Sequence, residues 1–125
     1  MQGLKYSLRK NIRSFRFAFQ GIVFLLRHEN NFRYHLMAAA LATGLGFYLN
    51  INVTEWLIVI ILIGLVLTAE AFNTSLEKLM DVLHPELHPK VGMAKDIAAA
   101  AVLIMACAAA IAGSIIFVGK LSIWQ

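Results

Sequence analysis

The stretch WLIVIILIGLVLTAEAFNTSLEKLMD, residues 56–81, joins an uncharged apolar run to a series of polar side chains. Residues 56–68 carry no charge and suit a helix crossing a bilayer, which needs about 20 residues. Four polar positions then follow without a break, and on a helix they fall within about 80° of arc and rise about 16 Å. These positions are Glu70, Asn73, Glu77 and Asp81. Because charges inside a membrane span usually face a bundle interior or a wet cavity, the stretch predicts a polar site at one end of a membrane helix.

The composition of the whole chain supports a membrane protein. Of its 125 residues, 60% are hydrophobic and 14% are charged, unlike an ordinary soluble domain. Uncharged runs before and after the quoted stretch indicate two more spans, so we expect one all-α membrane domain over residues 1–125 with spans at about 33–51, 55–80 and 94–119. The third span is rich in alanine and glycine, which let helix backbones approach closely, and we expect it at the centre of the bundle. So short a bundle encloses little by itself, which favours a homo-oligomer.

The N-terminal part of the chain is basic and amphipathic. Seven of the eleven lysines and arginines lie within the first 33 residues. The positive-inside rule therefore predicts a multi-pass protein of the cytoplasmic (inner) membrane with a cytoplasmic N-terminus. A cleavable signal peptide is not expected, because the apolar run begins only at about residue 36.

A helix over about residues 7–28 would lie in the membrane surface, with one basic face and one apolar face. The basic face would carry Arg9, Arg13, Arg16, Gln20 and Arg27, and the apolar face Phe15, Phe19, Ile22 and Leu26. This helix would either anchor the protein or also form one wall of a lipid-facing site.

Three more charged residues are predicted at the depth of the polar stretch. Glu29 precedes the first span, and Lys95 and Asp96 open the third. Carboxylate oxygens are ligands that Mg²⁺ prefers, often together with substrate phosphates. A metal, a cation and a carboxylate base are the parts that phosphoryl transfer requires. The sequence has no Walker A, GxGxxG or kinase catalytic-loop motif, so a nucleotide site here would be of another kind.

Two other interpretations of the polar stretch remain open at this point. It could form a hydrogen-bond ladder between helices, with Asn73 as the link and the carboxylates paired to cations. Lys95 and Arg33 are the only cations expected nearby, and three carboxylates outnumber them. The chain could also be a small oligomeric membrane transporter that uses an intramembrane glutamate, although a transporter would not need the charges gathered at the cytoplasmic end.

Three sequence blocks resemble the prokaryotic diacylglycerol kinase and undecaprenol kinase family. AEAFNTSLEKLMD, residues 69–81, is similar to its E-x-x-N-[ST]-x-x-E-x-x-x-D signature. MAKDIAAAAVL, residues 93–103, resembles its A-K-D-x-x-x-A-A-V-L block, and GIVFLLRHENNFRYH, residues 21–35, resembles the segment that carries an acidic residue before the first span. The resemblance covers roughly residues 17–117 in the right order and spacing.

This resemblance implies a homotrimer in which each subunit has a surface helix and three transmembrane helices. It implies transfer of the γ-phosphate of ATP, with Mg²⁺, to a membrane lipid alcohol at sites shared between subunits, and no nucleic acid partner. Carried over by position, Glu70 would be the catalytic base, and Glu29 and Glu77 would bind the metal. The residues implied to contact the nucleotide or organise its site are Lys10, Phe17, Glu29, Asn73, Glu77, Glu86, His88, Lys95 and Asp96.

The resemblance leaves the lipid alcohol open between undecaprenol and diacylglycerol, and thus the product between undecaprenyl phosphate and phosphatidic acid. The diacylglycerol-specific branch tends to carry a tyrosine where this chain has Phe17 and Gln-Glu where it has Tyr34-His35. The segments NFRYH and NTSLEK look closer to the undecaprenol kinase branch, which we therefore favour.

Overall fold

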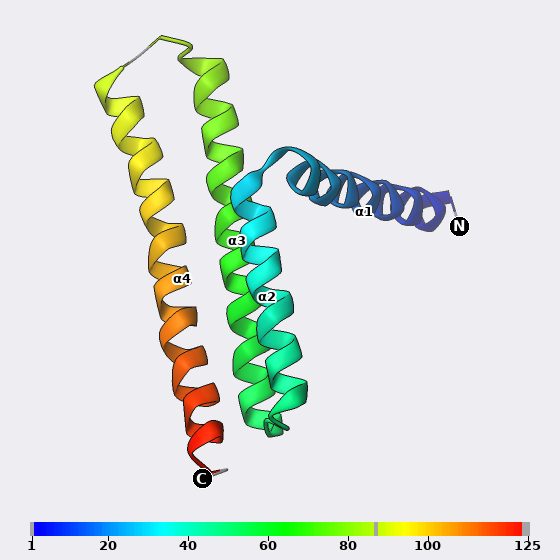
Figure 1. The fold of residues 1–125 in the computed structure, drawn as a ribbon. Helices are drawn as coiled ribbons and strands as arrows, with labels where there is room; N and C mark the ends of the chain where they lie inside the picture. Colours follow the sequence, from blue (N-terminus) through cyan, green and yellow to red (C-terminus); the bar gives the residue numbers. More distant parts are fainter. Residues whose placement is uncertain (1, 87, 124–125) are drawn as a thin grey trace.

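The computed structural model of the chain describes residues 2–86 and 88–123, and their side chains from residue 10 to residue 122. Within these residues the chain forms four helices and no strand: α1 (Gln2–His28), α2 (Asn30–Tyr48), α3 (Val53–Leu83) and α4 (Pro89–Ile123). The predicted all-α class is thereby confirmed. Figure 1 shows α2, α3 and α4 running side by side while α1 leaves this bundle at a steep angle.

Among the described helices, α3 and α4 are the two that are long and apolar enough to cross a membrane. Helix α2 contains 19 residues, but its first turns include Arg33 and several other polar side chains. The third span, the surface position of α1 and the trimer therefore stay predictions. Phe15 and Phe19 on the predicted apolar face of α1 are exposed, and the side chain of Arg9 on its basic face lies outside the described residues.

Helix α3, and not α4, occupies the middle of the bundle within one chain. Both α2 and α4 pack on α3, whereas α2 and α4 hardly touch each other (Figure 1). The expectation that the third span lies at the centre is therefore wrong for the single chain. Most contacts of α4 are made with α3, and its small residues Ala106, Ala109 and Ala110 line the space towards α2. A cavity of about 500 Å³ remains between the three helices.

The apolar core lies at the end of the bundle where α2 turns into α3. Its buried residues are Leu49, Ile51, Val59 and Ile116. The turn places Asn50 at φ 48°, a left-handed conformation that asparagine tolerates better than most residues. Gly46 allows the Trp56 ring to approach, because a Cβ at residue 46 would lie 2.8 Å from the ring.

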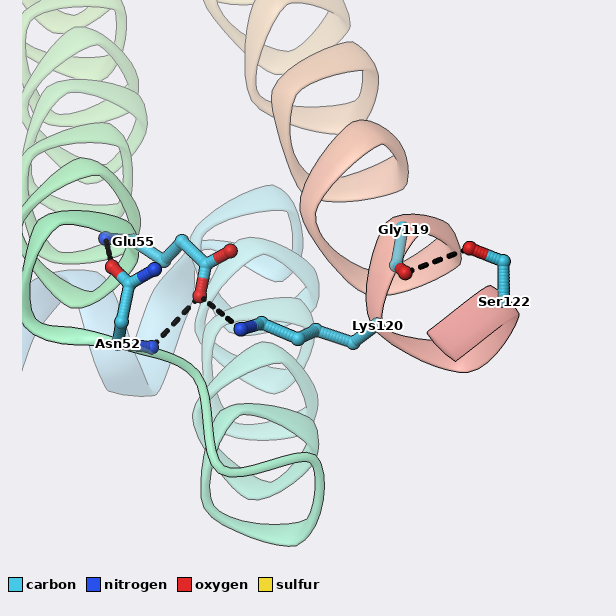
Figure 2. A network of polar contacts seen from close by, with 5 residues as sticks. All are labelled: Asn52, Glu55, Gly119, Lys120 and Ser122. Carbon is cyan, nitrogen blue, oxygen red and sulfur yellow. Dashed lines mark hydrogen bonds and ion pairs between the residues drawn. The ribbon is translucent and has the colours of Figure 1, made fainter. Parts of the chain in front are cut away.

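A polar network fixes the start of α3 and joins it to α4 (Figure 2). The Glu55 backbone N–H donates to Asn52 Oδ1 at 3.0 Å, and the Asn52 N–H donates to Glu55 Oε2 at 2.7 Å, which forms a capping box. Lys120 Nζ of α4 lies 3.1 Å from the same Glu55 oxygen. Asn52, Glu55 and Lys120 together are called the clamp below. Glu55 lies at the opposite end of α3 from Glu77 and Asp81, so its charge belongs to the clamp and not to the predicted site.

Candidate active site

The predicted site centres on three polar residues of α3 that are buried inside the bundle. Glu70, Asn73 and Thr74 have exposed fractions of only 3%, 6% and 4%. Residues three and four positions apart share one face of a helix, so this spacing turns all three towards the neighbouring helices. A buried carboxylate and amide on one helix face need partners, and the surrounding residues show what those partners are.

A cavity of about 190 Å³ opens beside Glu70 and Asn73. Asn31 and His35 of α2 form one side of it, and apolar residues of α4 around Val102 and Ala106 form the other. The His35 Nε2 atom lies 3.8 Å from Glu70 Oε2. Sequence reasoning missed Asn31 and His35 as lining residues. Their spacing of four residues, just before an uncharged run and close to Glu29, is the signal that could have found them.

Glu29 occupies the junction between α1 and α2, where it is the residue preceding the first turn of α2. Its backbone is extended there, so the chain changes direction at this residue and its side chain turns towards α3 (φ −112°, ψ 109°). The Lys78 ammonium of α3 lies 3.1 Å from Glu29 Oε1. The expectation that Lys95 and Arg33 are the only cations near the cluster is therefore wrong. Arg33 instead donates to the side chain of Asn30.

Glu77 lies one turn beyond Asn73 on α3 and accepts a hydrogen bond from it. The Asn73 Nδ2 group donates to Glu77 Oε1 over 3.3 Å. The oxygen of the same amide, Asn73 Oδ1, is buried and has no hydrogen-bond partner in the described part of the chain. Asn73 lines the smaller cavity, so its unpartnered oxygen could accept a hydrogen bond from a substrate or bind a metal ion there.

Asp81 and Lys95 join α3 to α4 near the loop that connects these helices. The Lys95 ammonium donates to Asp81 Oδ1, and the pair is partly exposed. Asp96 and the loop residues Glu86 and His88 are exposed as well. His88 Nδ1 accepts a hydrogen bond of 3.2 Å from the Lys90 backbone N–H.

Two predicted nucleotide contacts lie apart from this cluster within one chain. Lys10 and Phe17 are exposed on α1, which packs chiefly on α2 and projects away from the bundle (Figure 1). The Arg13 guanidinium lies over the Phe17 ring, 5.9 Å from its centre. The structure therefore brings Glu29, Glu70, Asn73 and Glu77 into one region, but it does not bring Lys10 or Phe17 to them.

The residues near Glu70 include oxygen donors of the kind that Mg²⁺ takes together with phosphates. Among the described residues, no group of three His, Cys, Asp or Glu side chains could hold a metal ion by itself. Glu77 lies about two turns beyond Glu70 on α3 and accepts a hydrogen bond from Asn73, and Glu29 is joined to the same helix through Lys78, so the three carboxylates lie in one region. Mg²⁺ commonly takes one or two carboxylates from the protein and its other ligands from phosphate and water. Two carboxylates and the unpartnered Asn73 Oδ1 are a donor set of this kind.

Comparison with known proteins gives a consistent result along the chain. A family model described as prokaryotic diacylglycerol kinase matches residues 16–117. The chain is 37% identical over 114 residues to the undecaprenol kinase of Bacillus subtilis (strain 168), covering 91% of this chain and 93% of that protein. It is 32% identical over 120 residues to a diacylglycerol kinase of Synechocystis sp., covering 89% and 69% of the two chains. A diacylglycerol kinase of Haemophilus influenzae is 31% identical over 107 residues, covering 85% and 91%.

Proposed function

The chain belongs to the prokaryotic diacylglycerol kinase family, and from this membership we propose that it transfers the γ-phosphate of ATP, with Mg²⁺, to the hydroxyl of undecaprenol. The family makes the protein a membrane lipid kinase, a phosphotransferase with an alcohol as acceptor. Kinase activity implies the use of ATP. Membership of this family also favours a kinase over the small membrane transporter that the sequence alone had left as an alternative.

One observation carries the assignment of the catalytic residue. Glu70 is a buried carboxylate that lines the smaller cavity, and this cavity shares His35 and Ala106 with a larger apolar cavity. The larger cavity, of about 500 Å³, is lined almost entirely by apolar side chains of the three bundle helices, such as Leu45, Ile63 and Phe117. A hydrocarbon chain is the ligand that such a lining suits. The hydroxyl end of a lipid alcohol bound in this cavity would then lie beside Glu70.

In the proposed reaction Glu70 acts as the general base. The lipid oxygen attacks the γ-phosphorus, its proton passes to the Glu70 carboxylate, and the bond from the γ-phosphorus to the bridging oxygen breaks to release ADP. A primary alcohol holds its proton far too tightly to lose it near neutral pH without such a base in hydrogen-bond reach. Glu70 is therefore the residue whose loss should stop the chemical step.

The remaining candidate residues would bind the nucleotide and the metal. Glu29 and Glu77 would hold Mg²⁺, which would supply positive charge to offset the negative charge of the phosphates. Asn73 would hold Glu77 through its amide and present Oδ1 to the site. Lys95 and Asp96 at the start of α4, with Glu86 and His88 in the preceding loop, would contact the nucleotide from the cytoplasmic side.

The isolated position of Lys10 and Phe17 supports a site completed by another subunit. We propose that α1 of one subunit reaches the nucleotide site of its neighbour in a homotrimer, with α2, α3 and α4 all crossing the inner membrane and the N-terminus in the cytoplasm. In this arrangement the exposed aromatic residues of α1 lie in the membrane surface.

A substrate panel tests the proposed reaction. The purified protein is given labelled ATP and Mg²⁺ with either undecaprenol or diacylglycerol in mixed micelles, and the phosphorylated lipid is separated and counted. We expect the larger kcat/KM with undecaprenol, in line with the match at 37% identity over 114 residues to an undecaprenol kinase, whereas a diacylglycerol kinase of equal identity, that of Helicobacter pylori, matches over 76 residues. A preference for diacylglycerol would reverse the lipid assignment and keep the lipid kinase, whereas no transfer to either alcohol would refute both.

A further inference from the structure

His35 connects the two cavities of the bundle. It lines the apolar cavity between α2, α3 and α4, and it also lines the smaller polar cavity at Glu70 and Asn73. Ala106 of α4 is the other residue common to both, but it has no polar group. The His35 imidazole is thus the polar side chain at the boundary between the cavity suited to a lipid chain and the cavity that contains Glu70.

The charges around Glu70 make this histidine distinctive. Glu77 on the same helix and Glu29 at the start of α2 both add negative charge near the Glu70 carboxylate. In the described part of the chain, His35 is the one basic side chain within ion-pair distance of Glu70. The cations Lys78 and Lys95 are engaged by Glu29 and Asp81 instead. The His35 imidazole is therefore the side chain placed to donate an N–H to the buried Glu70 carboxylate.

A packing role alone does not account for His35. Its side chain is 23% exposed while that of Glu70 is 3% exposed, so the ring lies between open space and the buried carboxylate. Its Nε2 atom is directed at Glu70 Oε2 over 3.8 Å. Distances between catalytic groups commonly shorten when substrate binds, so this separation is compatible with an N–H donated to Glu70 in the working complex.

We propose that His35 is a positioning residue for Glu70. Its imidazole N–H holds one oxygen of the Glu70 carboxylate, which directs the other oxygen towards the lipid hydroxyl arriving from the apolar cavity. This inference rests on the proposed role of Glu70 as the base, and it adds to that role a residue of α2 to which the sequence motifs gave no part in the reaction. A misplacement of a catalytic group by about 1 Å can cost about 100-fold in rate, so a residue in this position can matter without touching the phosphates.

Two substitutions at His35 distinguish a positioning role of this residue from a packing role. His35→Leu fills the site with an apolar side chain and removes the donor, whereas His35→Gln keeps an N–H donor. His84→Leu is the matched control, because it makes the same change at an exposed histidine after the end of α3. Each purified variant is assayed for lipid phosphorylation with ATP and lipid varied separately, and its thermal unfolding is measured in detergent.

We expect His35→Leu to lower kcat about 10- to 100-fold with the KM for ATP changed less than about 3-fold, and His35→Gln to recover most of the loss. His84→Leu should match the wild type. Wild-type kcat in His35→Leu would overturn the proposal, and so would a His35→Gln variant as slow as His35→Leu.

A second measurement does not depend on turnover. Dicyclohexylcarbodiimide reacts with protonated carboxyl groups in apolar surroundings, and the modified peptide is counted by mass spectrometry. Glu70 should be labelled several-fold faster in His35→Leu than in the wild type, because the carboxylate loses its one basic neighbour. Equal labelling rates would overturn the pairing of His35 with Glu70. A wild-type protein that phosphorylates no lipid alcohol would refute the proposed function instead, and the labelling result would still stand.

Discussion

The ammonium group of Lys78 on α3 lies 3.1 Å from the carboxylate of Glu29, at the junction of α1 and α2. The same ammonium lies over the Phe24 ring of α1, 5.7 Å from its centre. Lys78 is 58% exposed, so the ion pair contributes less than about 1 kcal/mol to stability. The pair shows that Glu29 lies beside α3, the helix that carries Glu77 and Glu70.

The first prediction concerns the proposed metal ligands Glu29 and Glu77. Replacing either by glutamine preserves the size of the side chain and removes one negative charge from the site, so activity should fall at least about 100-fold. The remaining activity should require a higher Mg²⁺ concentration than the wild type. Steady-state rates measured across a magnesium titration check both points.

Lys78→Met supplies the control for Glu29. It breaks the ion pair and leaves the carboxylate in place, so activity should stay within about 3-fold of the wild type if Glu29 acts through a metal. If Lys78→Met were as slow as Glu29→Gln, the ion pair and not a metal would explain the requirement for Glu29. Near-normal turnover of both glutamine variants would place the metal elsewhere.

The second prediction concerns Glu70 as the base. Glu70→Gln should remove most of the turnover, at least about 100-fold, and leave the affinity for MgATP nearly unchanged because Glu29, Glu77 and Lys95 remain. Calorimetric titration with a non-hydrolysable ATP analogue, beside the rate assay, makes the distinction. Glu55→Gln is the matched control on the same helix and should retain activity, since Glu55 belongs to the clamp at the opposite end. Loss of nucleotide binding in Glu70→Gln would mean that Glu70 helps to bind MgATP and would contradict its role as the base.

The third prediction concerns the apolar cavity as the lipid site. Ala109 of α4 lines this cavity, and a leucine there would occupy part of its volume of about 500 Å³. Ala109→Leu should therefore raise the KM for the lipid alcohol several-fold while the KM for ATP stays constant. Kinetics with polyprenols of decreasing length extend the test, because a shorter chain should be less affected. An unchanged KM for every lipid would exclude this cavity as the chain site.

The fourth prediction concerns assembly. Ala100 of α4 is exposed in the single chain and lies in the alanine-rich segment that we expect to pack against neighbours. Ala100→Leu should overpack that contact and shift the protein from trimer towards smaller species. Light scattering after size-exclusion chromatography in a mild detergent measures the change, with activity followed in the same fractions. A monomer with full activity would contradict the shared site.

The fifth prediction concerns the clamp between the turn and α4. Asn52→Ala removes the side chain that caps α3 (Figure 2) and should cost about 1 kcal/mol of stability. Because residues 52 and 70 are about 27 Å apart along the helix axis, kcat should not change. Thermal unfolding in detergent and the rate assay together test this. A large drop in kcat would mean that the two ends of α3 are coupled.

The sequence alone determined the features that depend on one helix at a time. Uncharged runs and turn residues predict where helices form, and the spacing of Glu70, Asn73 and Glu77 predicts a common face, because both follow from the 3.6-residue turn. The ordered blocks around these residues also indicated the family that the comparison with known proteins then identified. These properties can be predicted without knowing how the helices pack against one another.

Only the tertiary structure decided which side chains meet across helices. Lys78 pairs with Glu29 and His35 approaches Glu70, and neither contact follows from sequence spacing. The reason is geometric: periodicity gives the direction of a side chain about its own helix axis, but a contact also requires the rotation and the axial offset of the neighbouring helix. For α4, whose composition suggested a central position, most contacts are made with α3, and an apolar cavity lies between α4 and α2.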